Sequence, residues 1–339
     1  MQESISIKEI GARLGLDAPV VDREKIIRNI INLYKNDTMF GVNGTCSHIS
    51  PIVYPDHYFL AQRFDEKKED MRRALQDAFA KFNLKVFTVD REIGGFLLCN
   101  IAALIMGTAF GVYHISKEQK PNIYIELGIS IGLRKPFVLV KDRDAGIANI
   151  LNFVHYYEMN NYFSLSEEFG QLTNDYITRI GYVDETLIPK VSSETQEVCI
   201  SLGDLEVVDV GITLAKLVTK HGYQPVFLGD TDKTLVRFLE QKLIKPIFYQ
   251  TLQETANAIA CSKFGIYRID PSTSSSSFVN LGIAIGLNRP IFMINNTREE
   301  PPPSDLTIFG SLKFDGITDL DEKFDPEFNN WKERSLRAR

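Results

Sequence analysis

Two stretches of this sequence decide its fold, because they are one motif written twice. Residues 110–136 read FGVYHISKEQKPNIYIELGISIGLRKP, and residues 264–290 read FGIYRIDPSTSSSSFVNLGIAIGLNRP. They align without a gap and share a Phe-Gly-x-Tyr start, a Leu-Gly pair, a second glycine four residues later and a closing proline. An internal repeat indicates that the repeated segments have the same fold. We therefore interpret the chain as two copies of one domain.

The repeat extends upstream of the motif, since residues 57–90 match residues 197–230 in pattern: apolar run, loop, amphipathic stretch, apolar run, Asp. A length of 339 residues also suggests two domains, with room for two separate hydrophobic cores. We expect a helical lead over residues 1–55, a first copy over 56–185 and a second over 196–335, joined by a linker near 184–195. The lead is expected to pack on the first domain or on a dimer partner.

Each copy alternates short apolar runs with helical patterns. In the first copy these patterns predict strands at 58–62, 84–89, 109–115 and 135–141, and helices at 67–83, 96–106, 124–133 and 163–180. Strands separated by helices of this size imply βαβ crossovers and a parallel sheet covered on both faces. We therefore predict an α/β protein made of two tandem Rossmann-like or flavodoxin-like three-layer domains.

Composition and charge narrow the function. The chain is 44% hydrophobic and 24% charged, which is typical of a globular protein, and it has no apolar run of 18 residues and no signal-like start. We expect a cytoplasmic protein without membrane association. A net charge of −6 with scattered Lys and Arg argues against nucleic-acid binding and favours small-molecule chemistry.

Several chemical classes lack their motifs. The four cysteines form no CxxC pair, and Cys46 and His48 have no second ligand pair, so neither a disulfide framework nor a metal site is predicted. The sequence contains no GxGxxG after a strand, no GxxxxGK[ST] and no GxSxG. We therefore predict no dinucleotide cofactor, no P-loop ATPase and no nucleophile-elbow hydrolase.

The repeated motif lies where an open parallel sheet binds ligands, beyond the carboxyl ends of its strands. Glu126 is expected in the first turn or two of the helix after the third strand, where the helix dipole favours an ionised carboxylate. Such a group suits a nucleophile or the stabilisation of a sugar cation, and the alternative is a residue that only supports the helix start. Glycines four apart, at 128 and 132 and again at 282 and 286, are expected to let each helix approach its sheet closely.

The segments YFLAQRFDEK and PNIYIELGISIGLRKPFVLV resemble the TIR-like and nucleoside 2-deoxyribosyltransferase-like superfamily, through Asn-x-x-x-Glu-Leu-Gly followed by Gly-x-x-Lys-Pro. The resemblance covers most of 57–185 and, more weakly, 197–330. Members cleave or exchange N-glycosidic bonds of nucleosides, nucleotides or NAD through the motif glutamate, many of them in antiphage defence, and others only bind nucleotides. The resemblance implies Glu126 as the catalytic carboxylate, Asn122 as the motif asparagine, NAD as a substrate rather than a cofactor, and a homo-oligomer.

Further substrate contacts are expected from the loops after the first two strands and from the third strand. The candidates that would meet phosphate, base or ribose are Arg63, Phe64, Asp65, Arg91, Tyr113 and Tyr124. Surface ion pairs are the alternative for the arginines. A place in the core is the alternative for Tyr113, because it recurs as Tyr267.

Two departures from the family pattern qualify these expectations. His114 and Ser116 stand where many relatives carry Asp and Thr, which argues against deoxyribosyl transfer and leaves NAD-type cleavage less affected. Asn280 replaces Glu126 in the second copy, and an amide is neither nucleophile nor base, so that copy is predicted to be catalytically silent. Its loop at 272–277 is a candidate phosphate site, with a flexible degenerate loop as the alternative. An enzyme, a nucleotide sensor and an assembly scaffold all remain open.

Overall fold

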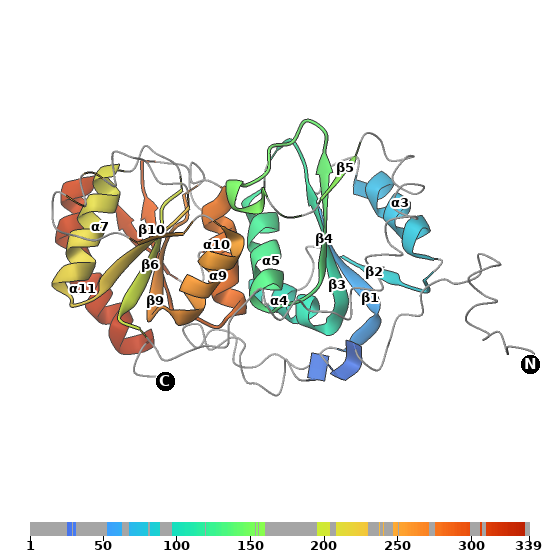
Figure 1. Ribbon diagram of the computed structural model, residues 1–339, viewed down its shortest axis with the longest axis horizontal. Coiled ribbons are helices and arrows are strands. Elements are labelled where there is room, and N and C mark those ends of the chain that lie inside the picture. Colours follow the sequence, from blue (N-terminus) through green and yellow to red (C-terminus); the bar gives the residue numbers. More distant parts are fainter. Residues whose placement is uncertain are drawn as a thin grey trace, which may run out of the picture.

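Two parallel β-sheets, one in each copy of the repeat, organise the chain (Figure 1). The computed structural model describes residues 26–28, 30–31, 53–62, 68–80, 82–88, 97–118, 120–152, 154, 156–159, 195–203, 208–229, 237, 240, 247–249, 251–270, 275–298, 306 and 310–335. The first copy contains β1 (Tyr54–Ala61), α3 (Lys68–Ala80), β2 (Lys85–Phe87), α4 (Leu97–Gly107), β3 (Thr108–Ile115), α5 (Pro121–Gly132), β4 (Phe137–Asp142), η2 (Asn149–Leu151) and β5 (Tyr157–Met159). The second contains β6 (Glu197–Ser201), α7 (Val208–Lys220), β7 (Gln224–Leu228), β8 (Ile247–Tyr249), α9 (Leu252–Cys261), β9 (Phe264–Arg268), α10 (Ser275–Gly286), β10 (Ile291–Asn296), β11 (Leu312–Phe314) and α11 (Ile317–Ser335).

The two sheets share the arrangement of five strands and differ at one edge. The first runs β2-β1-β3-β4-β5, and the second runs β11-β10-β9-β6-β7-β8. Every strand pairing is parallel. Counted from the first strand of each copy, the first sheet has the order 2-1-3-4-5 of flavodoxin-like folds. The second sheet, which has the additional edge strand β8, has the order 3-2-1-4-5-6 of Rossmann folds. The predicted tandem α/β fold is confirmed.

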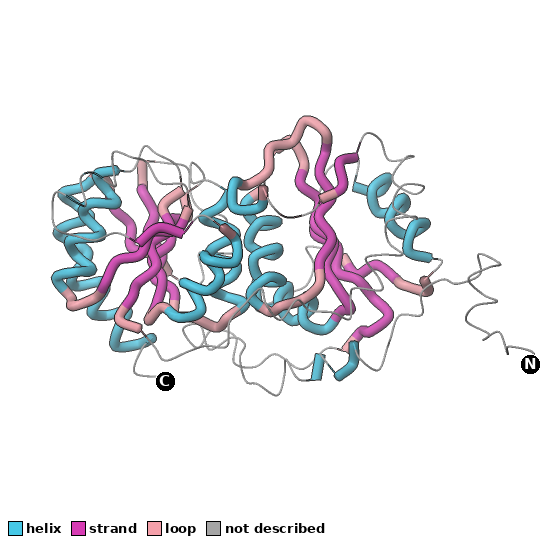
Figure 2. The backbone as a smooth tube through the Cα atoms, in the orientation of Figure 1, coloured by secondary structure: helices cyan, strands magenta, loops and turns pink. Residues whose placement is uncertain are grey.

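Helices cover both faces of each sheet (Figures 1 and 2). Helix α3 lies on the outer face of the first sheet, and α7 and α11 lie on the outer face of the second. The inner faces carry α4 and α5 in the first copy and α9 and α10 in the second, so these four helices form a central layer between the sheets. The two copies therefore meet through helices rather than through sheet edges.

The hydrophobic core is shared between the copies. Its central cluster joins residues of the first copy such as Phe59 and Leu127 to residues of the second such as Ile259 and Ile283. Two further clusters lie under the outer helices, one beneath α3 and one beneath α7 and α11. Each copy thus has a separate core beneath its outer helices, and the inner helices of both copies bury their apolar faces against each other in a third, shared core.

The Phe-Gly-x-Tyr start of the motif has a steric explanation. A Cβ built on Gly111 would lie 2.5 Å from Cε2 of Tyr113, and one on Gly265 would lie 2.5 Å from Cε2 of Tyr267. Each tyrosine ring therefore folds back over the glycine two residues earlier on the same face of its strand. Gly recurs at this place because a side chain there would collide with the ring.

The glycines of α5 and α10 hold the two copies together. A Cβ built on Gly128 would lie 2.8 Å from Cα of Gly282, and one on Gly282 would lie 2.8 Å from Cα of Gly128. The second pair repeats the contact, since a Cβ on Gly132 or on Gly286 would lie 3.0 Å from Cα of its counterpart. These glycines therefore pack helix against helix between the copies. We expected these glycines to bring each helix close to its own sheet. This expectation was wrong, because they bring α5 and α10 close to each other.

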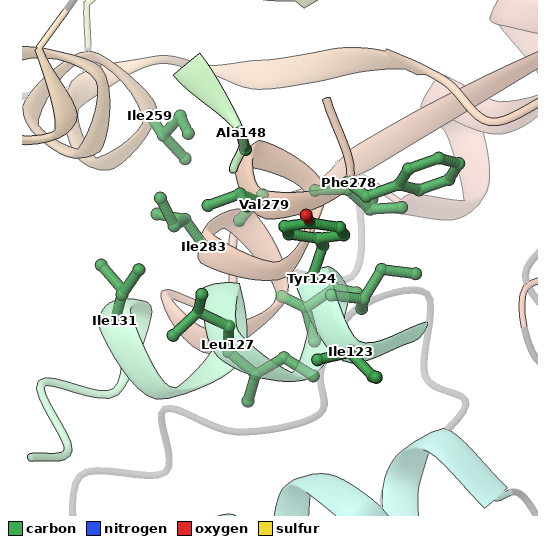
Figure 3. Close-up of a cluster of buried hydrophobic side chains, with 14 of the residues drawn as sticks. Ile123, Tyr124, Leu127, Ile131, Ala148, Ile259, Phe278, Val279 and Ile283 are labelled. Carbon is green, nitrogen blue, oxygen red and sulfur yellow. The ribbon is translucent and has the colours of Figure 1, made fainter. Parts of the chain in front are cut away.

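Apolar side chains surround this glycine contact. Figure 3 shows Tyr124 and Leu127 of α5 beside Val279 and Ile283 of α10, with Ile259 of α9 nearby. All five side chains are buried. The interface therefore combines backbone approach at the glycines with apolar burial around them, which close-packed interiors require.

The basic residue before the motif proline serves the fold. The Lys135 ammonium donates hydrogen bonds to the carbonyls of Met106 at 3.0 Å and Thr108 at 2.5 Å, where α4 passes into β3. In the second copy the Arg289 guanidinium donates to the carbonyl of Ser262 at the matching place after α9. Each cation is buried and supplies donors to carbonyls at a helix C-terminus.

Some predicted elements differ from the structure or lie outside it. The three-residue strands β5, β8 and β11 were not predicted, because such short segments show no usable periodicity. The predicted closing helix at 163–180 and most of the linker lie outside the described residues. Ile26 and Ile30 of the helical lead are buried in the cluster beneath α3, so this part packs on the first domain.

Replacing Gly128 or Gly282 with alanine should destabilise the protein. The added methyl group of either variant would collide with the backbone of the facing helix at the same place. We expect each variant to lose about 1–3 kcal/mol of unfolding free energy, as overpacked cores do. The double variant should cost less than the sum of the two, because one separation of the helices relieves both collisions. Urea unfolding of the four proteins tests this. Single variants within about 0.5 kcal/mol of the parent would show that the helices are not in close contact.

Stability should rise with pH through Lys135. Burial lowers the pKa of this ammonium from its ordinary value of 10.5 to about 7. Between these values the unfolded chain holds a proton that the folded chain has released, so alkaline pH favours folding. Lys135→Arg keeps its charge, as Arg289 does in the second copy. Its stability deficit relative to the parent should grow by up to about 1.4 kcal/mol per pH unit above pH 7. If the unfolding free energies of the parent and of Lys135→Arg, measured with denaturant, changed equally with pH, this account would be contradicted.

Candidate functional site

The candidate site lies at the switch point of the first sheet, where the chain order reverses between β1 and β3. At the carboxyl ends of these strands Ala61 is in register with Tyr113, and in the second copy Ser201 is in register with Tyr267. Ligands of open α/β sheets bind beyond this edge. The helix that follows β3, or β9 in the second copy, carries the motif residue at position 126 or 280.

Glu126 occupies the second turn of α5. The helix begins at Pro121 after Lys120, which provides no side-chain cap, and Glu126 is its sixth residue. The dipole effect is concentrated in the first turn, so it contributes less at Glu126 than the sequence suggested. The side chain of Glu126 is partly exposed in a helix that is otherwise largely buried. It is therefore a carboxylate within a mostly apolar surrounding that still reaches solvent.

Tyr113 lies beside Glu126 on the inner face of the sheet. Its hydroxyl is hydrogen-bonded to the Ser130 hydroxyl, one helical turn after Glu126. Burial raises the pKa of Tyr113 far above its ordinary value, the Ser130 hydrogen bond opposes this rise, and the charge of Glu126 adds to it. The phenol is thus held neutral and fixed in place. Asn122, Glu126 and Ser130 share one face of α5 because they are four residues apart.

The equivalent site of the second copy is closed by its own polar side chains. The Asn280 amide donates a hydrogen bond to the Ser201 hydroxyl at 3.0 Å, and the Ser201 and Ser277 hydroxyls are 3.1 Å apart. The Ser277 hydroxyl also donates to the carbonyls of Ser201 at 3.1 Å and Arg268 at 3.3 Å. Asn280 has no exposed surface. This network occupies the switch point with protein groups.

The first copy lacks the partners of that network. Ala61 stands at the place of Ser201, and Ile123 stands at the place of Ser277, so neither provides a hydroxyl. Glu126 keeps part of its surface in solvent, whereas Asn280 is fully buried. The two copies share a backbone arrangement and differ in whether the motif side chain is accessible.

A second difference lies on the outer face of the same sheet edge. His114, at the end of β3, is hydrogen-bonded through Nε2 to Oδ1 of Asp142, at the end of β4, at 2.8 Å. In the second copy Arg268 replaces His114 and forms a buried ion pair with Asp270, with nitrogen–oxygen distances of 2.7 and 2.6 Å. Asp142 was missed from the sequence, since the strand was expected to end at Lys141. A carboxylate directly after a predicted strand was the available signal.

The structure locates part of the predicted site. Arg63, Phe64, Asp65 and Arg91 lie outside the described residues. Asn122 is partly exposed near the start of α5 and stands on the face of Glu126.

The predicted stacking residues are core residues in this structure. Tyr113 is 0% and Tyr124 1% exposed, so neither presents a ring face on which a base could stack. Ser275, Ser276 and Ser277 belong to helix α10 rather than to a loop, and the Ser277 hydroxyl is used internally. Residues 272–274 of the predicted phosphate loop lie outside the described residues.

The described part of the chain has neither a cluster of metal ligands nor a helix that could span a membrane. It holds no group of three or more His, Cys, Asp or Glu side chains arranged to bind a metal ion, and Cys46 and His48 lie outside it. Among its helices, none is both long and apolar enough to cross a membrane. Burial raises the pKa of the free Cys199 thiol to about 12, which makes it a poor nucleophile.

Comparison with known proteins assigns no family. No protein-family model matches the chain, and no curated protein matches it.

The two motif tyrosines should respond differently to loss of their hydroxyl groups. Tyr113→Phe removes the buried hydrogen bond to Ser130 and should cost about 1 kcal/mol of stability. The hydroxyl of Tyr267 is buried without a hydrogen-bond partner, since Ala284 stands at the place of Ser130, so Tyr267→Phe should be neutral or stabilising. Denaturant unfolding of both variants tests this, and equal losses would contradict the assignment.

Proposed function

We propose that the first copy is an N-glycosidase that cleaves the ribosyl–base bond of a nucleotide, nucleoside or NAD with Glu126 as its catalytic carboxylate. The observation that carries the proposal is the contrast at the two switch points. Glu126 is partly exposed in the first copy, and the corresponding Asn280 is buried and hydrogen-bonded in the second. The first copy thus has an accessible carboxylate at its switch point, whereas the second copy has a buried amide at the equivalent position.

The chemistry asks for a carboxylate at such a place. Breaking a bond between C1′ of ribose and a base nitrogen develops positive charge on the sugar, as in glycoside hydrolysis. A carboxylate in an environment of low polarity stabilises that charge, either directly or by covalent capture of C1′. Glu126 is a partly exposed carboxylate in a largely buried helix, and the buried Tyr113 lies beside it.

The second copy is proposed to be silent and structural. An amide cannot act as nucleophile or base, and the Ser201 and Ser277 hydroxyls fill the space around Asn280 with internal hydrogen bonds. Its contribution is then to support α5 through α10. A defence role and assembly into oligomers, which the family resemblance implies, belong to this proposal as well.

Glu126→Gln tests the proposal, since it keeps the shape of the side chain and removes its charge. The full chain is incubated with NAD, with ribonucleosides and their 5′-monophosphates, and with 2′-deoxyribonucleosides, and the released base is measured by chromatography. We expect turnover to fall at least about 100-fold in the variant. Glu118→Gln is the matched control, because it makes the same change at an exposed residue of the loop before α5 and should leave turnover unaltered.

Other outcomes distinguish the alternatives. Equal turnover by the parent and by Glu126→Gln would remove the catalytic role from this residue. Ligand-dependent thermal stabilisation without turnover of any substrate would instead identify a nucleotide sensor, because a ligand that binds the folded state raises its stability.

A further inference from the structure

The pair formed by His114 and Asp142 has the geometry of an acid–base dyad. Nε2 of His114 and Oδ1 of Asp142 are 2.8 Å apart. His114 is the next-to-last residue of β3, and Asp142 is the last residue of the adjacent parallel strand β4. The His114 side chain is 7% exposed and that of Asp142 is 32% exposed, so the pair sits at the solvent edge of the sheet. A carboxylate that accepts from one ring nitrogen fixes the tautomer and the orientation of the imidazole.

The second ring nitrogen of His114 is not used within the described part of the chain. The hydrogen bond to Asp142 engages Nε2, and Nδ1 has no hydrogen-bond partner among the described residues. A largely buried imidazole with one nitrogen held by a carboxylate and the other unengaged is suited to proton transfer with a bound molecule.

The dyad occurs in the copy that keeps the glutamate and is absent from the copy that lost it. Arg268 and Asn296 replace His114 and Asp142 in the second copy. Arg268 is paired with Asp270, and an arginine keeps its proton throughout the physiological pH range. The Asn296 side-chain oxygen accepts from the backbone N–H of Arg298 at 3.1 Å in the following turn. The second copy therefore has neither the motif glutamate nor a histidine–aspartate pair at the equivalent positions.

We propose that His114 is the general acid that protonates the leaving base, with Asp142 as its positioning residue, and that the substrate is a purine nucleoside or nucleotide rather than NAD. This inference rests on the function proposed for Glu126. Glu126 lies on the inner face of the sheet and His114 on the outer face, because neighbouring residues of β3 alternate. A nucleoside across the carboxyl edge meets the carboxylate with its sugar and the imidazole with its base.

The proton balance explains why such a residue is needed. The bond between C1′ and N9 of the purine breaks with its electron pair on the base, and the His114 imidazolium gives its proton to a ring nitrogen, so the base leaves neutral. Water adds to C1′, and the proton that this water loses restores the imidazolium. The products are the free base and the sugar. NAD needs no such acid, because its nicotinamide is cationic in the substrate and leaves neutral without a proton.

Leaving-group dependence tests this inference in the full chain. Adenosine, inosine, their 5′-monophosphates, NAD and 4-nitrophenyl riboside, whose nitrophenolate leaves without help, are offered to the parent, His114→Asn, Asp142→Asn and Glu126→Gln. We expect His114→Asn to lower kcat for purine substrates about 100-fold or more and to change 4-nitrophenyl riboside cleavage less than about 3-fold. Asp142→Asn should show the same selectivity to a smaller degree, and Glu126→Gln should impair all substrates.

Any other outcome overturns the inference about His114. The Glu126→Gln variant shows whether the proposed function fails as well. Cleavage of NAD but of no purine substrate, with loss in Glu126→Gln, would keep the function and reject the acid. If His114→Asn lowered kcat equally for all substrates, or if its loss of activity were accompanied by a large fall in melting temperature, the pair of His114 and Asp142 would have a structural role only. No turnover by the parent on any substrate would reject both.

Discussion

The close contact between α5 and α10 is the constraint on which the rest of the structure depends. Two glycine pairs let the backbones of these helices touch, and the apolar side chains around them form a core cluster that both copies share. The same helices carry Glu126 and Asn280, so the candidate site of the first copy is built on the element that binds it to the second. The two copies therefore pack against each other and are not two independent domains joined by a linker.

Within this shared frame the copies have diverged in their polar side chains. In the second copy the Asn280 amide nitrogen, Ser201 and Ser277 are hydrogen-bonded to one another, whereas Oδ1 of Asn280 is buried without a hydrogen-bond partner among the described residues. Arg268 pairs with Asp270. Buried polar groups are stable when they are mutually hydrogen-bonded, so such a network supports a fixed structural module. The first copy keeps a partly exposed glutamate and a histidine at the matching edge. Of these two groups Glu126 keeps part of its surface in solvent, whereas His114 is largely buried.

Much of the fold was predictable from the sequence, because the repeat and its apolar runs are strong local signals. The strands and helices around the motif, the parallel sheets and the place of Glu126 after the third strand follow from periodicity. The partner of the glycines did not follow, since Gly128 would satisfy close packing on a sheet or on a helix equally well. The dyad of His114 and Asp142 was missed because its hydrogen bond joins two strands across 28 positions of the sequence, and periodicity does not reveal which strands are neighbours.

One binding measurement tests the central claim, that the tandem copies provide one ligand site and that Glu126 forms it. A ribose analogue with a protonated ring nitrogen imitates the sugar cation and should pair with an ionised carboxylate. Isothermal titration of the full chain with this cation should give one site per chain, absent in Glu126→Gln and retained in Ser201→Ala of the second copy. Two equivalent sites, or one site that survives Glu126→Gln, would contradict the account.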